Sequence, residues 1–215
     1  MSGRKKKLPI FQGLCTNTDF VKRERALAKI LLTGKQNKSN VFLKIGWLYD
    51  QWALISSIEQ REIYQRKAIK YFRLALHNGA ERWIVFNGLG TVNLHQGNLK
   101  EALQFYRKLH RIHKSSISYN ALGNVYRQLK RFIIAKRNYE YALKESGSGE
   151  EQSATLYNLI QLERQMSSAN NLNKKLAAKN YMIKLQRLVE KFPIAKILFT
   201  RTLCGKADSR DASPS

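Results

Sequence analysis

Few residues of this sequence have the types and the spacing that chemistry requires. His110 and His113 lie one helical turn apart, so both imidazoles could meet one metal ion. No acidic residue or cysteine lies beside them in the sequence to complete the tetrahedral set of a zinc site. Cys15 and Cys204 lie at opposite ends of the chain and form no Cys-x-x-Cys pair. We therefore predict two reduced thiols and no metal centre.

The motifs of the common enzyme classes are also missing. The sequence contains no phosphate-binding loop, no dinucleotide fingerprint and no Gly-x-Ser-x-Gly nucleophile motif. We interpret Gly88-Leu89-Gly90 as packing glycines within a helix. Glu150 and Glu151 fall in a linker, where we expect them to cap the next helix. The sequence therefore predicts a protein that is not an enzyme and that uses no cofactor.

The charge balance of the chain is strongly basic. Lys and Arg number 39 and Asp and Glu number 15, which gives a formal net charge of +24. This excess favours nucleic acid, acidic protein segments or an anionic membrane surface, although a solvated, self-repelling surface explains it too. Part of it lies in Arg4–Lys7, a basic arm that we expect to be disordered. Another part falls on a predicted outer helix face that could bind phosphates without regard to sequence, at Lys130, Arg131, Lys136 and Arg137.

Residues 87–143 contain an internal repeat. Three residues return 33 positions later, in the pairs Gly90 and Gly123, Ala102 and Ala135, and Tyr106 and Tyr139. A period of about 34 residues with this pattern is typical of helix-turn-helix repeats. The sequence thus predicts helical hairpins stacked side by side.

An earlier and longer copy of the repeat precedes these two. Gly46 and Ala68 are 22 residues apart, whereas Gly90 and Ala102 are 12 apart. The first repeat therefore carries an insertion of 10 residues. Because the stretch 50–63 contains neither Gly nor Pro, we expect the insertion to lengthen both helices of the hairpin instead of adding a loop.

These repeats resemble the tetratricopeptide repeat family. The small residues that the family keeps at the contact points of its two helices are matched by Gly46, Gly90 and Gly123 on the first and by Ala68, Ala102 and Ala135 on the second. The resemblance implies an all-α fold, a right-handed α-α superhelix of about three to four helix-turn-helix repeats with an N-terminal capping helix. We expect the repeats at about 39–82, 83–115, 116–149 and 152–192.

The remaining segments flank this repeat domain of 39–192. Residues 1–17 form the basic arm, and 18–38 form the capping helix and a loop, with the helix at 19–33 and Gly34 as its C-cap. We expect Pro193 to end the last repeat helix. A short helix and a disordered tail then occupy 193–215.

The resemblance also indicates which residues face the concave side. By analogy with the family, one face of each first helix points into the groove, with lower support in the fourth repeat. These residues are Leu43, Trp47, Asp50, Asn87, Thr91, Leu94, Asn120, Asn124, Arg127, Tyr157, Gln161 and Arg164. Asparagine amides can hydrogen-bond the backbone of an extended peptide, although a solvated polar face explains them equally well. Asn124 and Asn158 fit a carboxylate clamp known in the family, but the lysines of that clamp are missing.

The functional prediction is a scaffold or adaptor that holds a protein or peptide partner in its groove. The net charge leads us to expect an acidic partner. The alternative is a nucleic-acid-associated protein that binds RNA or DNA through its convex basic band. No apolar run approaches the roughly 20 residues of a membrane span, and the basic arm lacks a secretory apolar region. We therefore expect a cytoplasmic protein with no membrane span.

Overall fold

Helical hairpins make up the part of the chain that the structure describes. The computed structural model describes residues 17–34, 36–166 and 172–203, and all regular secondary structure in these ranges is α-helical. The helices are α1 (Asn17–Thr33), α2 (Lys38–Ile55), α3 (Ile58–His77), α4 (Arg82–His95), α5 (Leu99–Ile112), α6 (Ser116–Gln128), α7 (Phe132–Lys144), α8 (Gly149–Met166), α9 (Leu172–Gln186) and α10 (Pro193–Leu203). The predicted basic arm and most of the polar tail lie outside the described residues.

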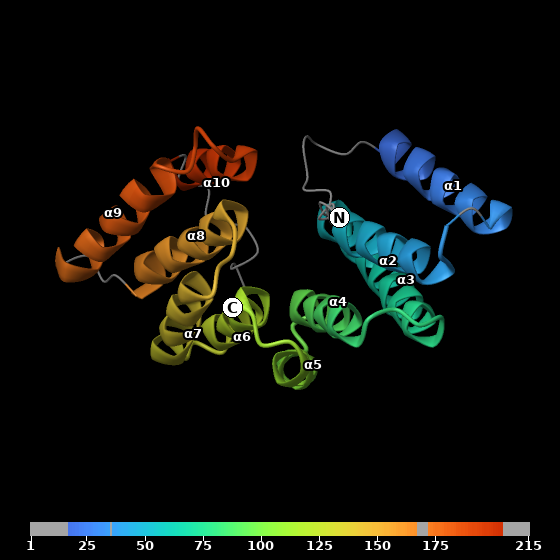
Figure 1. Ribbon diagram of the computed structural model, residues 1–215, viewed down its shortest axis with the longest axis horizontal. Coiled ribbons are helices and arrows are strands. Elements are labelled where there is room, and N and C mark those ends of the chain that lie inside the picture. The colour runs from blue at the N-terminus through green and yellow to red at the C-terminus, as the bar shows by residue number, and fades with distance from the viewer. Residues whose placement is uncertain (1–16, 35, 167–171, 204–215) are drawn as a thin grey trace, which may run out of the picture.

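The helices follow an arch with an inner and an outer layer (Figure 1). Helices α2, α4, α6 and α8 contact one another in succession along the inner side. Each packs against the helix that follows it, so α3, α5, α7 and α9 form the outer layer. Helix α1 packs on α2 at one end, and α10 packs on α8 and α9 at the other.

A glycine on an inner helix faces a buried aromatic ring of the outer helix in three hairpins. A Cβ atom at Gly46 would lie 2.9 Å from the Phe72 ring. At Gly90 it would lie 2.5 Å from Tyr106, and at Gly123 it would lie 2.5 Å from Tyr139. Since real Cβ atoms do not approach other atoms this closely, only glycine permits the observed helix spacing. The predicted role of these glycines is confirmed.

Gly88 plays a related part between two hairpins. A Cβ atom there would lie 2.5 Å from the ring of Phe72, which therefore fills the space between α2, α3 and α4. Gly88-Leu89-Gly90 is thus a packing segment within α4, as the sequence indicated.

The insertion in the first hairpin lengthens its helices, as predicted. Helices α2 and α3 contain 18 and 20 residues, whereas the helices from α4 to α7 contain 13 or 14. The added length gives α1 a surface to pack on. Phe20 of α1 stacks on Trp52 at a centroid distance of 4.7 Å and meets the edge of Tyr64 at 5.7 Å. The insertion therefore anchors the N-terminal helix.

Three helices end in the same type of turn. The residues Ala80, Asn98 and Arg131 each donate their backbone N–H to a carbonyl five residues earlier, at 2.8–2.9 Å. The residue before each of them has a positive φ: 81° at Gly79, 79° at Gly97 and 56° at Lys130. Glycine takes this conformation at little cost, whereas Lys130 holds it with a side chain. Gly34, the predicted C-cap of α1, has a φ of 63°.

The C-terminal part of the chain corrects two predictions. Helix α9 ends at Gln186, so Pro193 does not terminate it. Pro193 is the first residue of α10, where its missing N–H is not needed for an intrahelical bond. Glu150 and Glu151 belong to the first turn of α8 and not to a linker. The Ser148 hydroxyl caps the helix start by accepting a bond from the Glu151 N–H at 3.2 Å, and the Glu151 carboxylate accepts one from the Gly147 N–H just before the helix, also at 3.2 Å.

No helix in the described ranges is long and apolar enough to cross a membrane.

Replacement of Gly123 by alanine tests the close approach of α6 and α7. The added methyl group would collide with the Tyr139 ring, so we expect the free energy of unfolding to fall by about 1–3 kcal/mol. The midpoint of urea unfolding measures this change. Gly147→Ala is the matched control, because no atom lies within 4 Å of a Cβ atom at Gly147. Equal effects of the two substitutions would contradict the packing role of Gly123.

Replacement of Lys130 by glycine tests the backbone strain at the end of α6. Because the φ of 56° disfavours any side chain, we expect Lys130→Gly to raise the free energy of unfolding by about 0.5–1 kcal/mol. Lys130→Ala removes the same charge but keeps a Cβ atom, so it should bring no such gain. If alanine stabilised the protein as much as glycine, the strain would not be the cause.

Candidate functional site

A polar cavity lies between the inner helices α4, α6 and α8. Its volume is about 220 Å³, and its lining includes four of the residues predicted for the concave face: Asn87, Thr91, Asn120 and Asn124. Asn87 and Thr91 come from α4, and Asn120 and Asn124 occupy the corresponding positions of α6. The repeat thus places the same two positions of successive helices around one cavity.

Buried tyrosines of the outer helices form hydrogen bonds with two of these side chains. The Tyr139 hydroxyl donates to the Asn124 carbonyl oxygen at 2.7 Å, and the Tyr106 hydroxyl lies 3.0 Å from the Thr91 hydroxyl. Burial raises the pKa of both tyrosines, so their hydroxyls keep their protons at neutral pH. With its oxygen engaged, Asn124 is left with its NH₂ group for a ligand.

Asn120 is oriented by a residue of the next inner helix. Its carbonyl oxygen accepts a bond from the side-chain NH₂ group of Asn158 at 3.0 Å, which ties α6 to α8. Within the described ranges, the NH₂ groups of Asn120 and Asn124 donate to no other residue, and the Asn87 side chain makes no hydrogen bond. The cavity therefore presents three carboxamide groups that can bond a ligand.

Glu151 supplies the one carboxylate of the cavity lining. Its Oε2 atom accepts bonds from the Ser116 hydroxyl at 2.5 Å and from the Gly147 N–H at 3.2 Å. None of the described residues that line the cavity is Lys or Arg. Sequence reasoning missed Glu151 as a cavity residue, because α8 lacks the glycine that aligns the other inner helices. It considered Asn158 only for a carboxylate clamp, whereas this residue bonds Asn120. The pairing of Glu151 and Asn158 with residues 35 and 38 positions earlier becomes visible only in the folded chain.

The predicted residues of α2 and the end of α4 lie in the protein core. Leu43 and Leu94 are buried in apolar clusters, and Trp47 meets Phe72 edge-on at 5.2 Å. Asp50 is also buried, and its carboxylate lies 3.0 Å from the Nδ1 atom of His95. Leu43, Trp47 and Asp50 join α2 to its neighbours, whereas Leu94 packs with residues of α5 and α6, and none of the four lines the cavity.

The other predicted groove residues also lie away from the cavity lining. Tyr157 packs against the apolar cluster formed by α8, α9 and α10. Arg127 lies beside the Tyr139 phenol, where its charge lowers the pKa that burial raises. Gln161 is half-buried and Arg164 is exposed. The residues of α8 that line the cavity are Glu151, Ala154 and Thr155. The face of α8 predicted to point into the groove therefore differs from the face that reaches the cavity.

His110 and His113 are close in the sequence but contact different residues. The Nδ1 atom of His110 lies 2.9 Å from the Ser118 hydroxyl, and the ring meets Tyr119 edge-on. His113 stacks on Trp83 at a centroid distance of 4.4 Å. Burial, with a smaller contribution from Lys114, lowers the pKa of His110. In the described parts of the chain, no three His, Cys, Asp or Glu residues are grouped to hold a metal ion.

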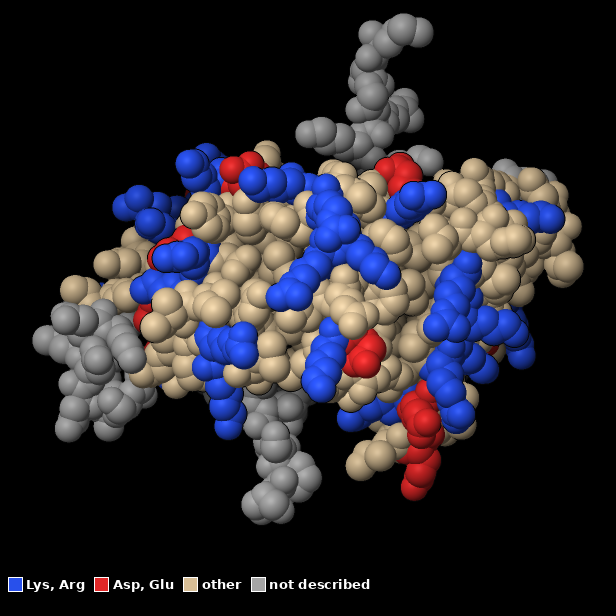
Figure 2. Space-filling model, turned by 90° about the horizontal axis from the view of Figure 1, so that it is seen from below, with Lys and Arg blue, Asp and Glu red and all other residues tan. Residues whose placement is uncertain are grey.

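Lys and Arg side chains are spread along the outer side of the arch (Figure 2). The four predicted phosphate-binding residues are not equivalent there. Lys136 forms an ion pair of 2.7 Å with Glu163, whose side chain is only 1% exposed, and this bond raises the pKa of Lys136. Lys130 forms the strained turn after α6, and Arg131 is the N-cap residue of α7. Arg131 and Arg137 remain exposed.

The ion pair between α7 and α8 is tested by removal of its lysine. Lys136→Ala would leave the buried Glu163 carboxylate without its cation. Since the Lys136 side chain is itself 35% exposed, we expect a loss of about 2 kcal/mol in the free energy of unfolding, measured by urea denaturation. The neighbouring Arg137→Ala should change it by no more than about 0.5 kcal/mol. Similar losses for both variants would contradict the structural role of Lys136.

No protein-family model and no curated protein matches this chain. The helical arrangement and the polar cavity between α4, α6 and α8 are therefore the basis for its functional interpretation.

Proposed function

We propose that this chain is a protein-binding scaffold of tetratricopeptide-like repeats that holds an extended peptide segment of a partner. In this proposal the helical hairpins form a right-handed superhelix, and the cavity between α4, α6 and α8 is part of its concave groove. The protein acts by binding and not by catalysis. The observation that carries the proposal is the set of three carboxamide groups, on Asn87, Asn120 and Asn124, around one cavity.

The chemistry of the cavity suits a polypeptide backbone. An extended peptide carries one N–H and one carbonyl group per residue, and a carboxamide can bond either of them. The NH₂ groups of Asn120 and Asn124 suit backbone carbonyls, because the oxygens of both residues are already engaged. At about 220 Å³ the cavity is smaller than typical small-molecule pockets of roughly 300–1,000 Å³, which favours a short part of a longer chain.

We further propose that the partner is acidic overall and that the protein works in the cytoplasm. The support for an acidic partner is the net charge of +24, which attracts anionic molecules over a long range. The cavity lining itself contains Glu151 and neither Lys nor Arg. The segment inside the cavity would therefore be neutral or basic, and the acidic residues of the partner would bind elsewhere. Nucleic-acid binding through α7 has less support, because Lys136 is engaged with Glu163.

The proposal is tested with peptides selected for binding to this protein. Peptides of about ten residues, which extend over roughly 33–36 Å, would be displayed on phage and selected against the wild-type chain. The affinity of the best one, synthesised with a fluorescent label, would be measured by fluorescence anisotropy. We expect Asn87→Ala to weaken binding about fivefold, the effect of one lost hydrogen bond. Its side chain makes no bond to the described residues, so the fold should keep its stability.

Asn138→Ala is the matched control, because Asn138 lies on α7 and, among the described residues, its side chain bonds just the Ile134 carbonyl of its own helix. Its affinity for the selected peptide should equal that of the wild type. The proposal would be wrong if no peptide were selected. It would also be wrong if Asn87→Ala and Asn120→Ala bound the peptide as tightly as Asn138→Ala does.

A further inference from the structure

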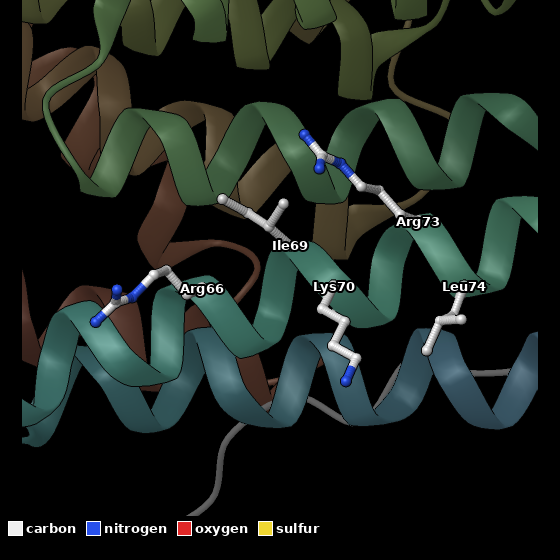
Figure 3. Close-up of a pocket in the computed structure, with 5 residues that line it drawn as sticks. All are labelled: Arg66, Ile69, Lys70, Arg73 and Leu74. Carbon is white, nitrogen blue, oxygen red and sulfur yellow. The ribbon is translucent and has the colours of Figure 1, made fainter.

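A second hollow lies on the outer layer, along one stripe of α3. Its volume is about 420 Å³, and it is lined by Arg66, Ile69, Lys70, Arg73 and Leu74. These positions recur every three or four residues and therefore share one face of the helix. In Figure 3 these side chains extend to both sides of α3. None of them belongs to the cavity of the inner helices or to the basic band on α7.

The hollow combines cations with apolar side chains. Arg66, Lys70 and Arg73 are exposed, whereas Ile69 and Leu74 are half-buried. The nearest acidic partner is Glu62, 4.0 Å from Arg66, and both side chains of this pair are about two-thirds exposed or more, at 67% and 72%. Lys70 and Arg73 form no ion pair with the described residues. The surface thus combines three positive charges with two half-buried apolar side chains.

Another face of α3 is used for packing. Ala68, Phe72 and Ala75 are fully buried against α2 and α4, and Lys67 lies 5.1 Å from the centre of the Tyr49 ring. On the stripe from Arg66 to Leu74, Ile69 packs partly against the same core, whereas the three cations are exposed. Because the inner cavity carries a carboxylate and no cation, this stripe is better suited to the acidic residues of a partner.

We propose that the α3 hollow binds an acidic amphipathic helix of a partner protein. The apolar side chains of the partner helix would lie over Ile69 and Leu74. Its carboxylates, next to those apolar side chains, would pair with Arg66, Lys70 and Arg73. Such a helix lays its apolar face into a groove, and the surrounding charges fix its orientation. This site is separate from the proposed peptide groove, and its existence does not depend on that proposal.

The lining favours a peptide over nucleic acid. Single-stranded nucleic acids bind through aromatic side chains on which the bases stack, and none of the described residues that line this hollow is aromatic. Phosphates would use the three cations but gain nothing from Ile69 and Leu74. An acidic amphipathic helix uses both kinds of side chain.

The probe for this proposal is a labelled peptide of about 14 residues, or four helical turns, composed of Leu and Glu with leucines along one helical face. Its affinity for the full chain would be measured by fluorescence anisotropy at low salt. We expect the triple variant Arg66→Gln, Lys70→Gln, Arg73→Gln to bind roughly tenfold more weakly, because three exposed ion pairs are lost. Glutamine keeps much of each aliphatic stem, and circular dichroism would verify that the helices remain.

The matched control removes the same three residue types from α7 and its N-cap. The variant Arg131→Gln, Arg137→Gln, Lys144→Gln has the same net charge as the α3 variant, and all three of its positions are exposed. It should retain nearly the wild-type affinity for the peptide. A second control is a peptide of the same composition with scrambled order, which should bind more weakly than the amphipathic one.

Three results would overturn the proposal. Equal losses in the two triple variants would show that only net charge matters. Equal affinity for the scrambled and the amphipathic peptide would show that Ile69 and Leu74 do not contribute to binding. A labelled oligouridylate of about 20 nucleotides that bound more tightly than the peptide, and lost this binding in the α3 variant, would assign the hollow to nucleic acid. Asn87→Ala should leave peptide binding at α3 unchanged, which separates this test from that of the inner cavity.

Discussion

The close approach of two helices at a glycine is the contact on which each of the first three hairpins depends. Phe72, Tyr106 and Tyr139 lie with their rings against Gly46, Gly90 and Gly123, at distances that leave no room for a Cβ atom. Each ring is almost fully buried, so its position sets the spacing between the inner and the outer helix. Because one hairpin cannot bury its apolar surface alone, the stacking of successive hairpins completes the core.

The same rings connect the core to the candidate binding surface. The residue after each glycine faces the aromatic ring: Trp47 meets Phe72, Thr91 meets the Tyr106 hydroxyl and Asn124 meets the Tyr139 hydroxyl. Where the inner residue is polar the outer ring carries a hydroxyl, and where it is tryptophan the ring carries none. The polar cavity therefore begins at α4, since the α2 position is filled by an aromatic pair. A change that moves one of these tyrosines would alter the fold and the cavity together.

Acidic residues are scarce in this basic chain, and several of them lie at contacts between helices. Asp50 meets His95 between α2 and α4, Glu151 bonds Ser116 between α6 and α8, and Glu163 pairs with Lys136 between α7 and α8. Buried carboxylates persist where hydrogen bonds or cations offset the loss of hydration. The exposed Lys and Arg side chains of the outer layer are consequently left with few acidic neighbours. An acidic partner would provide the missing charges.

The helical hairpins could be predicted from the sequence, because small and aromatic residues that return at a fixed spacing reflect local contacts within each repeat. The resemblance to tetratricopeptide repeats predicted that Asn87, Thr91, Asn120 and Asn124 face inward, and these four residues line the cavity. Three features are visible only in the folded chain: which of the predicted groove positions belong to the core, which face of α8 reaches the cavity, and that Lys136 is bound by Glu163. These features depend on contacts between residues far apart in the chain, such as Ser116 with Glu151 and Asn120 with Asn158. Spacing along one helix carries no information about such partners.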